Sequence, residues 1–183
     1  MEVLVPIADG SEEIETVCIV DTLVRAGANV TVVSVQTGTL QCTMSRGVKM
    51  TADAMIEDVA SKEYNCIALP GGMPGAKTIG ECEPFIALLK RHAEANKLYG
   101  AICAAPAVAL LPNGLLPAGE ATCHPGFADK LPNCSEKRVV HNGQVVTSRG
   151  PGTAIEFALK LVELLVDEEK AKAVAGPMLV HMP

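Results

Sequence analysis

One segment of the sequence places a cysteine where an apolar strand pattern gives way to a helical one. Residues 101–106 read AICAAP, so Cys103 stands at the expected turn. A nucleophile elbow needs a reactive residue on a tight strand-to-helix turn, with small side chains two positions away on either side. Ala101 and Ala105 meet this requirement. The start of the helix is expected to lower the pKa of the Cys103 thiol, although the local pattern also fits a buried structural cysteine.

A glycine-rich segment follows another apolar run. Residues 70–75 read PGGMPG, and Gly71 and Gly72 would let backbone amides approach an anionic centre, as in an oxyanion hole. A plain strand-to-helix turn uses the same residue types. The carboxyl ends of neighbouring parallel strands meet at one edge of a sheet. The segment is therefore a candidate anion site beside Cys103.

Three glutamates open the first expected helix. For Glu12 and Glu13, the favourable interaction of a carboxylate with the start of a helix is a sufficient explanation. Glu15 lies one turn further in, between Ile14 and Thr16, and is expected to point towards the sheet edge. Burial raises the pKa of a carboxyl group, so a buried Glu15 would keep a proton that it can donate to or shuttle from a thiolate.

The four histidines differ in their sequence surroundings. His124 follows a short expected strand that ends at Cys123, and it fits either an acid–base group or a structural histidine. His92 on a charged helix face and His141 in a hairpin are expected to be solvated. His181 lies in a terminal tail that ends at Pro183, and we assign it no role.

Alternating strand and helix patterns predict an α/β fold with a mainly parallel sheet. Buried strands are expected at residues 3–7, 29–35, 66–69 and 98–102. Helices are expected at residues 12–26, around 85–93, at 153–166 and at 170–175. Short strands are expected at residues 120–123, 138–141 and 144–147. Asn142-Gly143 between the last two predicts a hairpin turn near the carboxyl end of the chain.

The first helix is expected to begin near Ser11, which itself or through a neighbour provides the cap, and to end at Gly27. Such a helix packs one face against the sheet. The side chains expected on that face are Ile14, Val17, Ile19, Val20 and Leu23.

The composition narrows the class of protein. A chain of 183 residues can form one domain spanning residues 1–183, with its own core. A net charge of −6 argues against nucleic acid or an anionic membrane as a partner. Glu2 and Asp9 interrupt the short apolar start, so we expect no secretory signal, and no apolar run approaches transmembrane length. The seven cysteines are odd in number and lack C-x-x-C spacing, so we expect reduced thiols in the cytoplasm and no metal site.

Four segments together resemble the DJ-one/ThiJ/PfpI superfamily, close to the parkinsonism-associated deglycase branch and its bacterial relatives. They occur in family order and span nearly the whole chain: DGSEEIET at 9–16, LPGGMPG at 69–75, AICAAP at 101–106 and TSRGPGT at 147–153. In combination they are highly specific. The resemblance implies a flavodoxin-like three-layer sandwich that pairs as a homodimer and uses no cofactor.

The resemblance also implies roles for individual residues. Cys103 matches the family nucleophile, Glu15 the protonated glutamate beside it and His124 a nearby histidine. The oxyanion-binding group would comprise Gly71, Gly72 and the amide of Ala104. Arg46 matches an arginine that reaches the partner's site across the dimer, and Arg25 is expected at the same interface. The residues expected near the pocket are Ser148, Gly150 and Pro151.

Three positions qualify the resemblance. Ala105 replaces a glycine of the animal branch, whereas bacterial relatives carry alanine. Thr51 stands where some animal members have a second redox cysteine, so the role of that cysteine is not transferred. Ala104 stands where the protease-like branch has a histidine, and this argues against peptidase activity.

The family resemblance implies an enzyme that acts on α-oxoaldehydes such as methylglyoxal, or on glycated proteins, through a Cys103 thiolate. A cysteine of this kind is also a candidate peroxide sensor with a role in oxidative stress, with or without redox-dependent chaperone activity. A biosynthetic kinase-like function lacks support, because the sequence has no G-x-x-x-x-G-K-[ST] loop.

Overall fold

Short apolar runs form the central strands of the sheet. The computed structural model describes residues 1–180, so the predictions for His181 and for the tail ending at Pro183 lie outside the described residues. The four runs with the strongest strand pattern give β1 (Glu2–Ile7), β2 (Asn29–Ser34), β6 (Cys66–Leu69) and β7 (Leu98–Ile102). The last two strands have the predicted boundaries.

The main sheet has seven strands in the order β5-β2-β1-β6-β7-β9-β8. All neighbouring pairs are parallel except β8 with β9, which form the predicted hairpin around Gly143. The strands at or near its edges are β5 (Ala54–Met55), β8 (Val139–Asn142) and β9 (Val145–Ser148). A separate antiparallel pair consists of β3 (Gln41–Thr43) and β4 (Lys49–Thr51).

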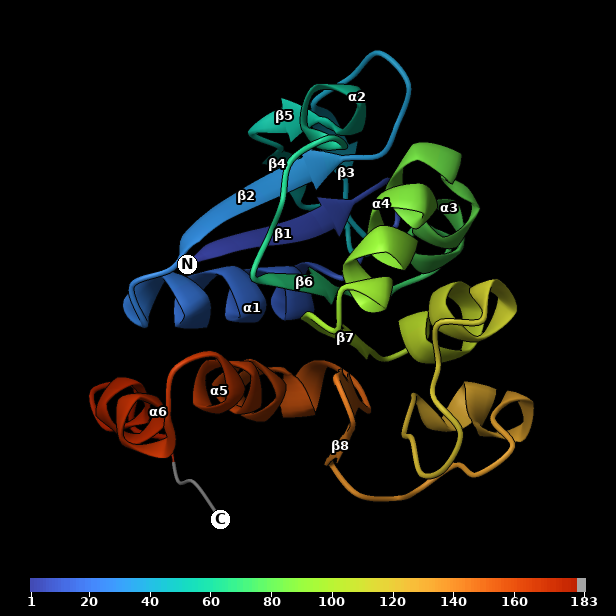
Figure 1. Ribbon diagram of the computed structural model, residues 1–183. Helices are drawn as coiled ribbons and strands as arrows, with labels where there is room; N and C mark the ends of the chain where they lie inside the picture. The colour runs from blue at the N-terminus through green and yellow to red at the C-terminus, as the bar shows by residue number, and fades with distance from the viewer. Residues whose placement is uncertain (181–183) are drawn as a thin grey trace.

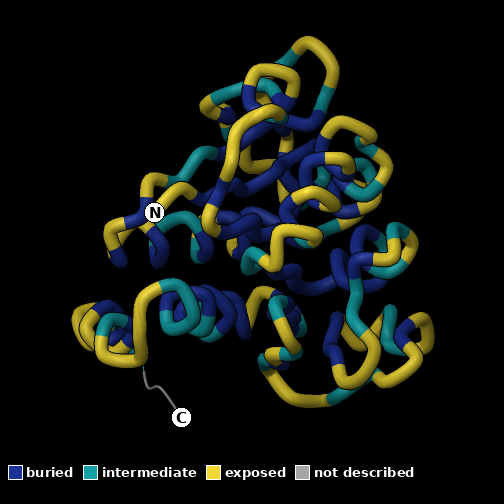
Figure 2. Tube along the Cα trace, in the orientation of Figure 1, coloured by how far each residue is buried: buried dark blue, intermediate teal, exposed yellow. Residues whose placement is uncertain are grey.

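Helices cover both faces of the sheet, which explains why its central strands β1, β6 and β7 are mostly apolar (Figures 1 and 2). Leu4 and Ile67 pack on the face covered by α2 (Ile56–Val59), α3 (Gly75–Glu81) and α4 (Glu83–Glu94). Val3 and Ala68 alternate with them and pack on the face covered by α1 (Glu13–Arg25), α5 (Ala154–Leu165) and α6 (Glu168–Ala175). This arrangement confirms the predicted three-layer flavodoxin-like sandwich with a mainly parallel sheet.

Helix α1 buries a different face from the one predicted. Glu12 caps it by accepting a hydrogen bond from the backbone N–H of Glu15, and Ile19 and Leu23 are fully buried as expected. Ile14 and Val17, however, are 54% and 52% exposed. At 100° per residue these two side chains point well away from the stripe that contains Ile19 and Leu23, so the prediction for them is wrong.

Two further local predictions are wrong. Residues 120–123 form no strand, because the backbone N–H of Thr122 donates to the Thr147 hydroxyl and a single bridge joins Ala121 to Cys134. His92 is only 5% exposed rather than solvated, with Nε2 2.7 Å from the carbonyl oxygen of Leu98. Burial lowers the pKa of His92. His141 is exposed, as predicted.

Among residues 1–180, none of the helices combines the length and the apolar character needed to cross a membrane.

Candidate active site

Cys103 stands at the carboxyl end of β7 on a turn with a strained backbone. Its φ angle of +64° lies in the left-handed region, which a residue with a Cβ adopts at a cost of about 1 kcal/mol or more. The N–H of Cys103 donates to the carbonyl oxygen of Ser148 at 3.0 Å and so ties the turn to the end of β9. Ala101 and Ala105 are fully buried. The structure therefore has the tight turn and the small flanking residues of a nucleophile elbow.

Glu15 lies beside this turn, fully buried in the first turn of α1. Its Oε2 atom accepts a hydrogen bond of 2.7 Å from the N–H of Gly71, whereas Oε1 is buried without a hydrogen-bond partner among the described residues. Burial raises the pKa of the Glu15 carboxyl from 4.5 to about 7, although the bond from Gly71 acts in the opposite direction. The unpartnered Oε1 is therefore the atom that has room for a proton.

Gly71 occupies a position that has no space for a side chain. A Cβ there would lie 2.5 Å from the Cβ of Cys103 and 2.9 Å from Oε2 of Glu15. The absence of a side chain lets the β6 turn and the Cys103 turn approach each other closely. The N–H of Gly71 is directed at Glu15. The sequence placed this amide in an oxyanion-binding group, whereas the structure uses it to position the carboxyl.

Two other backbone amides face the sulfur atom of Cys103. Burial raises the pKa of the Cys103 thiol to about 12 and the Glu15 carboxyl adds to the rise, while hydrogen bonds from the N–H groups of Gly72 and Ala104 lower it. The expected lowering of the thiol pKa is therefore wrong. The segment that follows is a short π-helical turn, Pro106–Leu110, so few aligned peptide dipoles oppose the effect of burial.

Glu15 and Cys103 therefore form a coupled buried pair. The charge of the carboxylate raises the pKa of the thiol, so the pair loses one proton near pH 7 and the second near pH 12. Between these two pH values the pair carries a single negative charge, either on the Glu15 oxygen atoms or on the Cys103 sulfur. The form with the charge on Cys103 has a thiolate next to a protonated carboxylic acid, which is a nucleophile beside a proton donor.

The raised pKa of Glu15 predicts a pH dependence of stability. The folded chain binds this proton more tightly than the unfolded chain, so the stabilisation is complete below pH 4.5 and is lost as pH rises through about 7. The unfolding free energy should fall across this window by about 3 kcal/mol more in the wild type than in Glu15→Gln. Urea unfolding at a series of pH values measures the difference, and parallel curves for the two proteins would contradict it.

His124 contacts the site through its backbone. Its N–H donates to the carbonyl oxygen of Cys103 at 2.8 Å. The side chain is exposed, and Nδ1 accepts a hydrogen bond of 3.1 Å from the N–H of Gly126. The ring carbon Cδ2 lies 3.7 Å from the position of a Cβ built on Gly150. With Nδ1 occupied, Nε2 is the ring nitrogen that remains for proton transfer.

The two arginines assigned by resemblance lie away from the buried pair. Arg46 is exposed; its N–H donates to Oε1 of Glu13 at 2.8 Å and its guanidinium to the carbonyl oxygen of Ser45. Arg25 pairs with Asp21 on the surface of α1 at 2.7 Å. Within the described residues, neither guanidinium is recorded in contact with Cys103 or Glu15, and their role across a dimer stays a prediction.

The segment 148–153 forms the support of the Cys103 turn. Ser148 is buried, and its hydroxyl lies 2.7 Å from that of Thr153 and donates to the carbonyl oxygen of Arg138. Gly150 precedes a short 3₁₀ turn in which the exposed Pro151 takes the first position. Of this segment, Ser148 touches Cys103 directly through its backbone, and Pro151 faces solvent.

Sequence reasoning missed a contact that joins α1 to the β3–β4 region. Glu13 was explained by the helix start alone, yet it is 7% exposed and accepts hydrogen bonds from the Ser45 hydroxyl and the N–H of Arg46. Burial of Glu13 is outweighed by these bonds, and the pKa of the carboxyl is lowered. No local sequence signal indicates this contact, because the partners are 32 and 33 positions apart.

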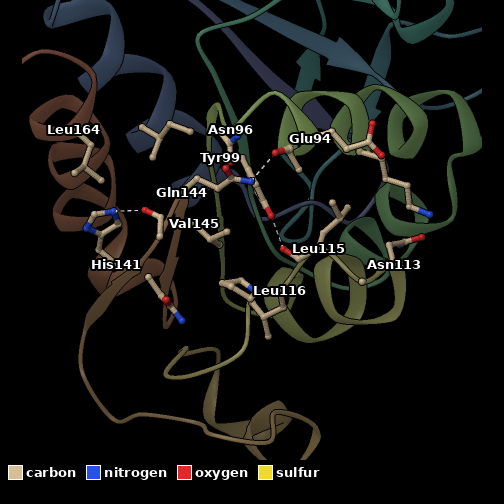
Figure 3. Close-up of a pocket in the computed structure, with 17 residues that line it drawn as sticks. Glu94, Asn96, Tyr99, Asn113, Leu115, Leu116, His141, Gln144, Val145 and Leu164 are labelled. Atoms are coloured by element: carbon tan, nitrogen blue, oxygen red, sulfur yellow. Dashed lines mark hydrogen bonds between the residues drawn. The ribbon is translucent and has the colours of Figure 1, made fainter.

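A separate hollow lies away from the buried pair. It has a volume of about 1010 Å³ and is lined by residues at the start of β7 and at the β8–β9 turn, including Tyr99, His141 and Gln144 (Figure 3). Tyr99 and Gln144 already donate hydrogen bonds to the carbonyl oxygens of Leu115 and Ala93. Cys103 follows the opposite end of β7, so this hollow is separate from the buried pair.

Across residues 1–180, no group of three or more His, Cys, Asp and Glu side chains is arranged to hold a metal ion.

Comparisons with known proteins agree with one another. Protein DJ-1 homolog A of Arabidopsis thaliana is 47% identical over 181 residues, which are 98% of this chain and 46% of that protein. The chain thus spans about half the length of this curated relative. Glutathione-independent glyoxalase DJR-1.2 of Caenorhabditis elegans is 39% identical over 180 residues, 96% of this chain and 94% of that protein.

Solved structures show the same relationship. Oxidized DJ-1 of Toxoplasma gondii superposes with a TM-score of 0.96 at 49% identity and covers 99% of both chains. DJ-1beta of Drosophila melanogaster gives a TM-score of 0.93 at 38% identity, with 99% of this chain and 98% of that chain covered. The family model described as "DJ-1/PfpI family" matches residues 1–164. The chain therefore belongs to the DJ-1/PfpI family.

Proposed function

We propose that this chain converts α-oxoaldehydes, with methylglyoxal as the model substrate, into hydroxy acids without glutathione. The observation that carries the proposal is the buried pair of Cys103 and Glu15, held together by Gly71. The name of the Caenorhabditis elegans relative, a glutathione-independent glyoxalase, supports the same chemistry. All groups that the reaction requires come from the chain, the substrate and water.

The first step forms a bond between sulfur and carbon. The Cys103 thiolate attacks the aldehyde carbon of methylglyoxal, and the carbonyl oxygen takes a proton from the Glu15 carboxyl to give a hemithioacetal. The N–H groups of Gly72 and Ala104, which face the sulfur, lie where they can also stabilise negative charge beside it. Glu15 is left as a carboxylate and can act as a base.

The second step moves a proton between the two substrate carbons. Glu15 removes the hydrogen from the carbon bonded to sulfur, and a proton is returned to the neighbouring carbon. The hydroxyl proton of the hemithioacetal moves to the ketone oxygen, and the product is a thioester of lactate. Water then cleaves the thioester, releasing lactate and the Cys103 thiol. The aldehyde carbon is oxidised and the ketone carbon is reduced, so no external oxidant is needed. Nε2 of His124 is a second candidate for one of these transfers.

In the deglycase form of the proposal, the substrate is an aldehyde already attached to an amino, thiol or guanidino group of a protein. The thiolate would attack the carbon derived from the aldehyde, and the protein group would be released. Both forms need the same pair of residues. They differ in whether the bound carbonyl compound is free or still attached to a protein.

Product analysis tests the proposal. Methylglyoxal should be converted to lactate by the purified chain in a thiol-free buffer that contains a chelator, with proton NMR identifying the product. Lactate that does not exceed the amount formed by buffer alone would contradict the proposal. Comparing free methylglyoxal with a pre-formed glycated peptide, purified from free aldehyde, distinguishes the two forms.

A second candidate function is redox sensing by Cys103, with or without redox-dependent chaperone activity. The amides of Gly72 and Ala104, which face the sulfur, would also stabilise a sulfinate. A sulfinate forms when two peroxide molecules each transfer one oxygen atom to the thiolate and are reduced to water or an alcohol. All seven cysteines are unpaired, and this supports a reducing compartment such as the cytoplasm. After mild peroxide treatment, mass spectrometry should find the sulfinate at Cys103; its equal distribution over the other thiols would contradict this function.

We also propose that two copies of the chain associate through α1. Ile14, Val17 and Val24 are each more than half exposed, and their spacing of three and seven residues puts them on one face. Exposed apolar side chains gathered on one helix face indicate an interaction surface. Arg25 lies next to Val24 on the same exposed part of the helix.

A charge on this face should separate the two copies. Val17→Asp would place one carboxylate from each copy in the interface at a cost on the order of 2 kcal/mol each, weakening association by on the order of 1000-fold. Light scattering coupled to size exclusion measures the mass. Val166→Asp, at another exposed apolar position, is the matched control and should leave the dimer intact. An unchanged mass for Val17→Asp at low micromolar concentration would contradict this interface.

A further inference from the structure

Two cysteines outside the proposed catalytic pair lie with their sulfur atoms in contact. Cys123 and Cys134 are eleven positions apart in the sequence, and their Sγ atoms are 4.0 Å apart. The two short segments that carry them are joined by backbone contacts, because the N–H of Ser135 donates to the carbonyl oxygen of Ala121 at 2.7 Å. The hydroxyl of Thr122 donates to the carbonyl oxygen of Ser135, also at 2.7 Å. The pair is therefore held in place by its main chain.

The sulfur atoms would have to move closer together to form a disulfide. A disulfide has a sulfur–sulfur distance of about 2 Å, so the two atoms must approach by about 2 Å. Neither sulfur makes a strong competing contact: Cys123 Sγ donates to the carbonyl oxygen of His124 at 3.4 Å and Cys134 Sγ to that of Ser135 at 3.9 Å. Thiols are weak hydrogen-bond donors, so little is lost when these contacts break.

The two thiols differ in their access to solvent. Cys134 is partly exposed, whereas Cys123 is 1% exposed and packs with Ala107 and Leu131. Burial raises the pKa of Cys123 to about 12, and the neighbouring Cys134 adds to the rise, while Arg149 acts in the opposite direction. An oxidant in solution therefore meets Cys134 first, and the buried Cys123 is the thiol that resolves the product.

We propose that Cys123 and Cys134 form a reversible disulfide when the chain encounters a peroxide. The peroxide oxidises the Cys134 thiol to a sulfenic acid and is itself reduced to an alcohol or water. The sulfur of Cys123 then attacks that of Cys134, the sulfur–sulfur bond forms and water leaves. The two thiols thus supply two electrons in total, and two equivalents of a small-molecule thiol return the disulfide to the dithiol by exchange.

This second redox site lies directly against the Cys103 turn. The residue after Cys123 is His124, whose N–H donates to the carbonyl oxygen of Cys103 at 2.8 Å. The charge of Cys103 is also near enough to influence the Cys123 thiol. A disulfide would fix the segment on which the main chain of Cys103 rests. The site does not depend on the proposed aldehyde chemistry, because neither thiol takes part in it.

Peptide mapping of the peroxide-treated chain tests the proposal. The reduced protein is diluted, treated with hydrogen peroxide, alkylated and digested without reductant. Cleavage after Glu120 separates Cys103 from Cys123, and cleavage after Lys130 separates Cys123 from Cys134. We expect a linked pair of peptides containing Cys123 and Cys134 in most chains, and its loss on treatment with dithiothreitol.

Three variants make the result specific. Cys103→Ala should retain the linked peptides, which shows that the site works without the proposed nucleophile. Cys134→Ser removes one partner of the disulfide, so Cys123 should react with the alkylating reagent once the chain is unfolded. Cys82→Ser changes another partly exposed cysteine and should leave the disulfide unchanged. The proposal is overturned if Cys123 and Cys134 stay unlinked at a peroxide concentration that oxidises Cys103, or if links to other cysteines are equally frequent.

Discussion

Replacing Cys103 by alanine is expected to abolish the conversion of methylglyoxal to lactate. The thiolate forms the bond to the aldehyde carbon, and the sulfur of Cys103 is the one that the amides of Gly72 and Ala104 face. The value of kcat/KM should therefore fall on the order of 1000-fold or more. Alanine can keep the turn, since it occupies the same backbone position and removes only the sulfur atom. The measurement is initial-rate lactate formation in a metal-free, thiol-free buffer.

The control for this result is a second cysteine. Cys82 occupies the N-cap position of α4 without a capping hydrogen bond from its side chain, and it lies outside the buried pair. Cys82→Ala should therefore retain activity. Circular dichroism and a thermal melt on both variants establish that the fold is intact. The account would be wrong if folded Cys103→Ala kept more than a small fraction of the wild-type rate.

Changing Glu15 to glutamine is expected to lower kcat on the order of 100-fold or more, because general acid–base groups contribute at least that much. The amide fills the same space but cannot move a proton, so KM should change much less than kcat. The pH profile provides a second readout. In the wild type, the charge of the Glu15 carboxylate raises the pKa of the Cys103 thiol, so alkylation of Cys103 by iodoacetamide should rise mainly at high pH. In Glu15→Gln this charge is absent, so the rise should move to lower pH.

A glutamate on the surface provides the control. Glu57→Gln alters an exposed carboxyl at the start of α2, and both kcat and the alkylation profile should stay as in the wild type. If Glu15→Gln has the same profile as the wild type, Glu15 and Cys103 are not coupled as the structure indicates.

The central strands could be predicted from sequence because burial on both faces requires continuous apolar runs. The segments at 66–69 and 98–102 have the predicted limits for this reason. The face of α1 could not be assigned in the same way. Ile14 and Val17 are apolar but exposed, and their residue type does not reveal whether they face the sheet or a second molecule.

The positions of the site residues follow from topology, whereas their electrostatics do not. Parallel strands bring the ends of β6 and β7 together, which is why Gly71 meets Cys103. The sequence did not reveal that the Gly71 amide is occupied by Glu15, or that burial outweighs the amides around the thiol. The hydrogen bond between Gly71 and Glu15 and the pKa of the thiol both depend on small differences in interatomic distance and on the extent of burial.

Sequence patterns also did not predict contacts between segments that are far apart in the chain. Cys123 and Cys134 lack the C-x-x-C spacing that would indicate a paired function, and they meet because the backbone around Ala121 and Ser135 joins two irregular segments. The same holds for Glu13 and Ser45, which lie on separate elements.

The central claim is that the sulfur of Cys103 becomes covalently bonded to the substrate. The most direct test is an acid-quenched single turnover with methylglyoxal, followed by peptide mass spectrometry with cleavage after Glu120 to isolate Cys103 from Cys123. The account predicts a lactate thioester on Cys103 that hydroxylamine removes and that disappears as free lactate accumulates. Lactate formation without any adduct on Cys103 at any quench time, or an adduct that never turns over, would contradict it.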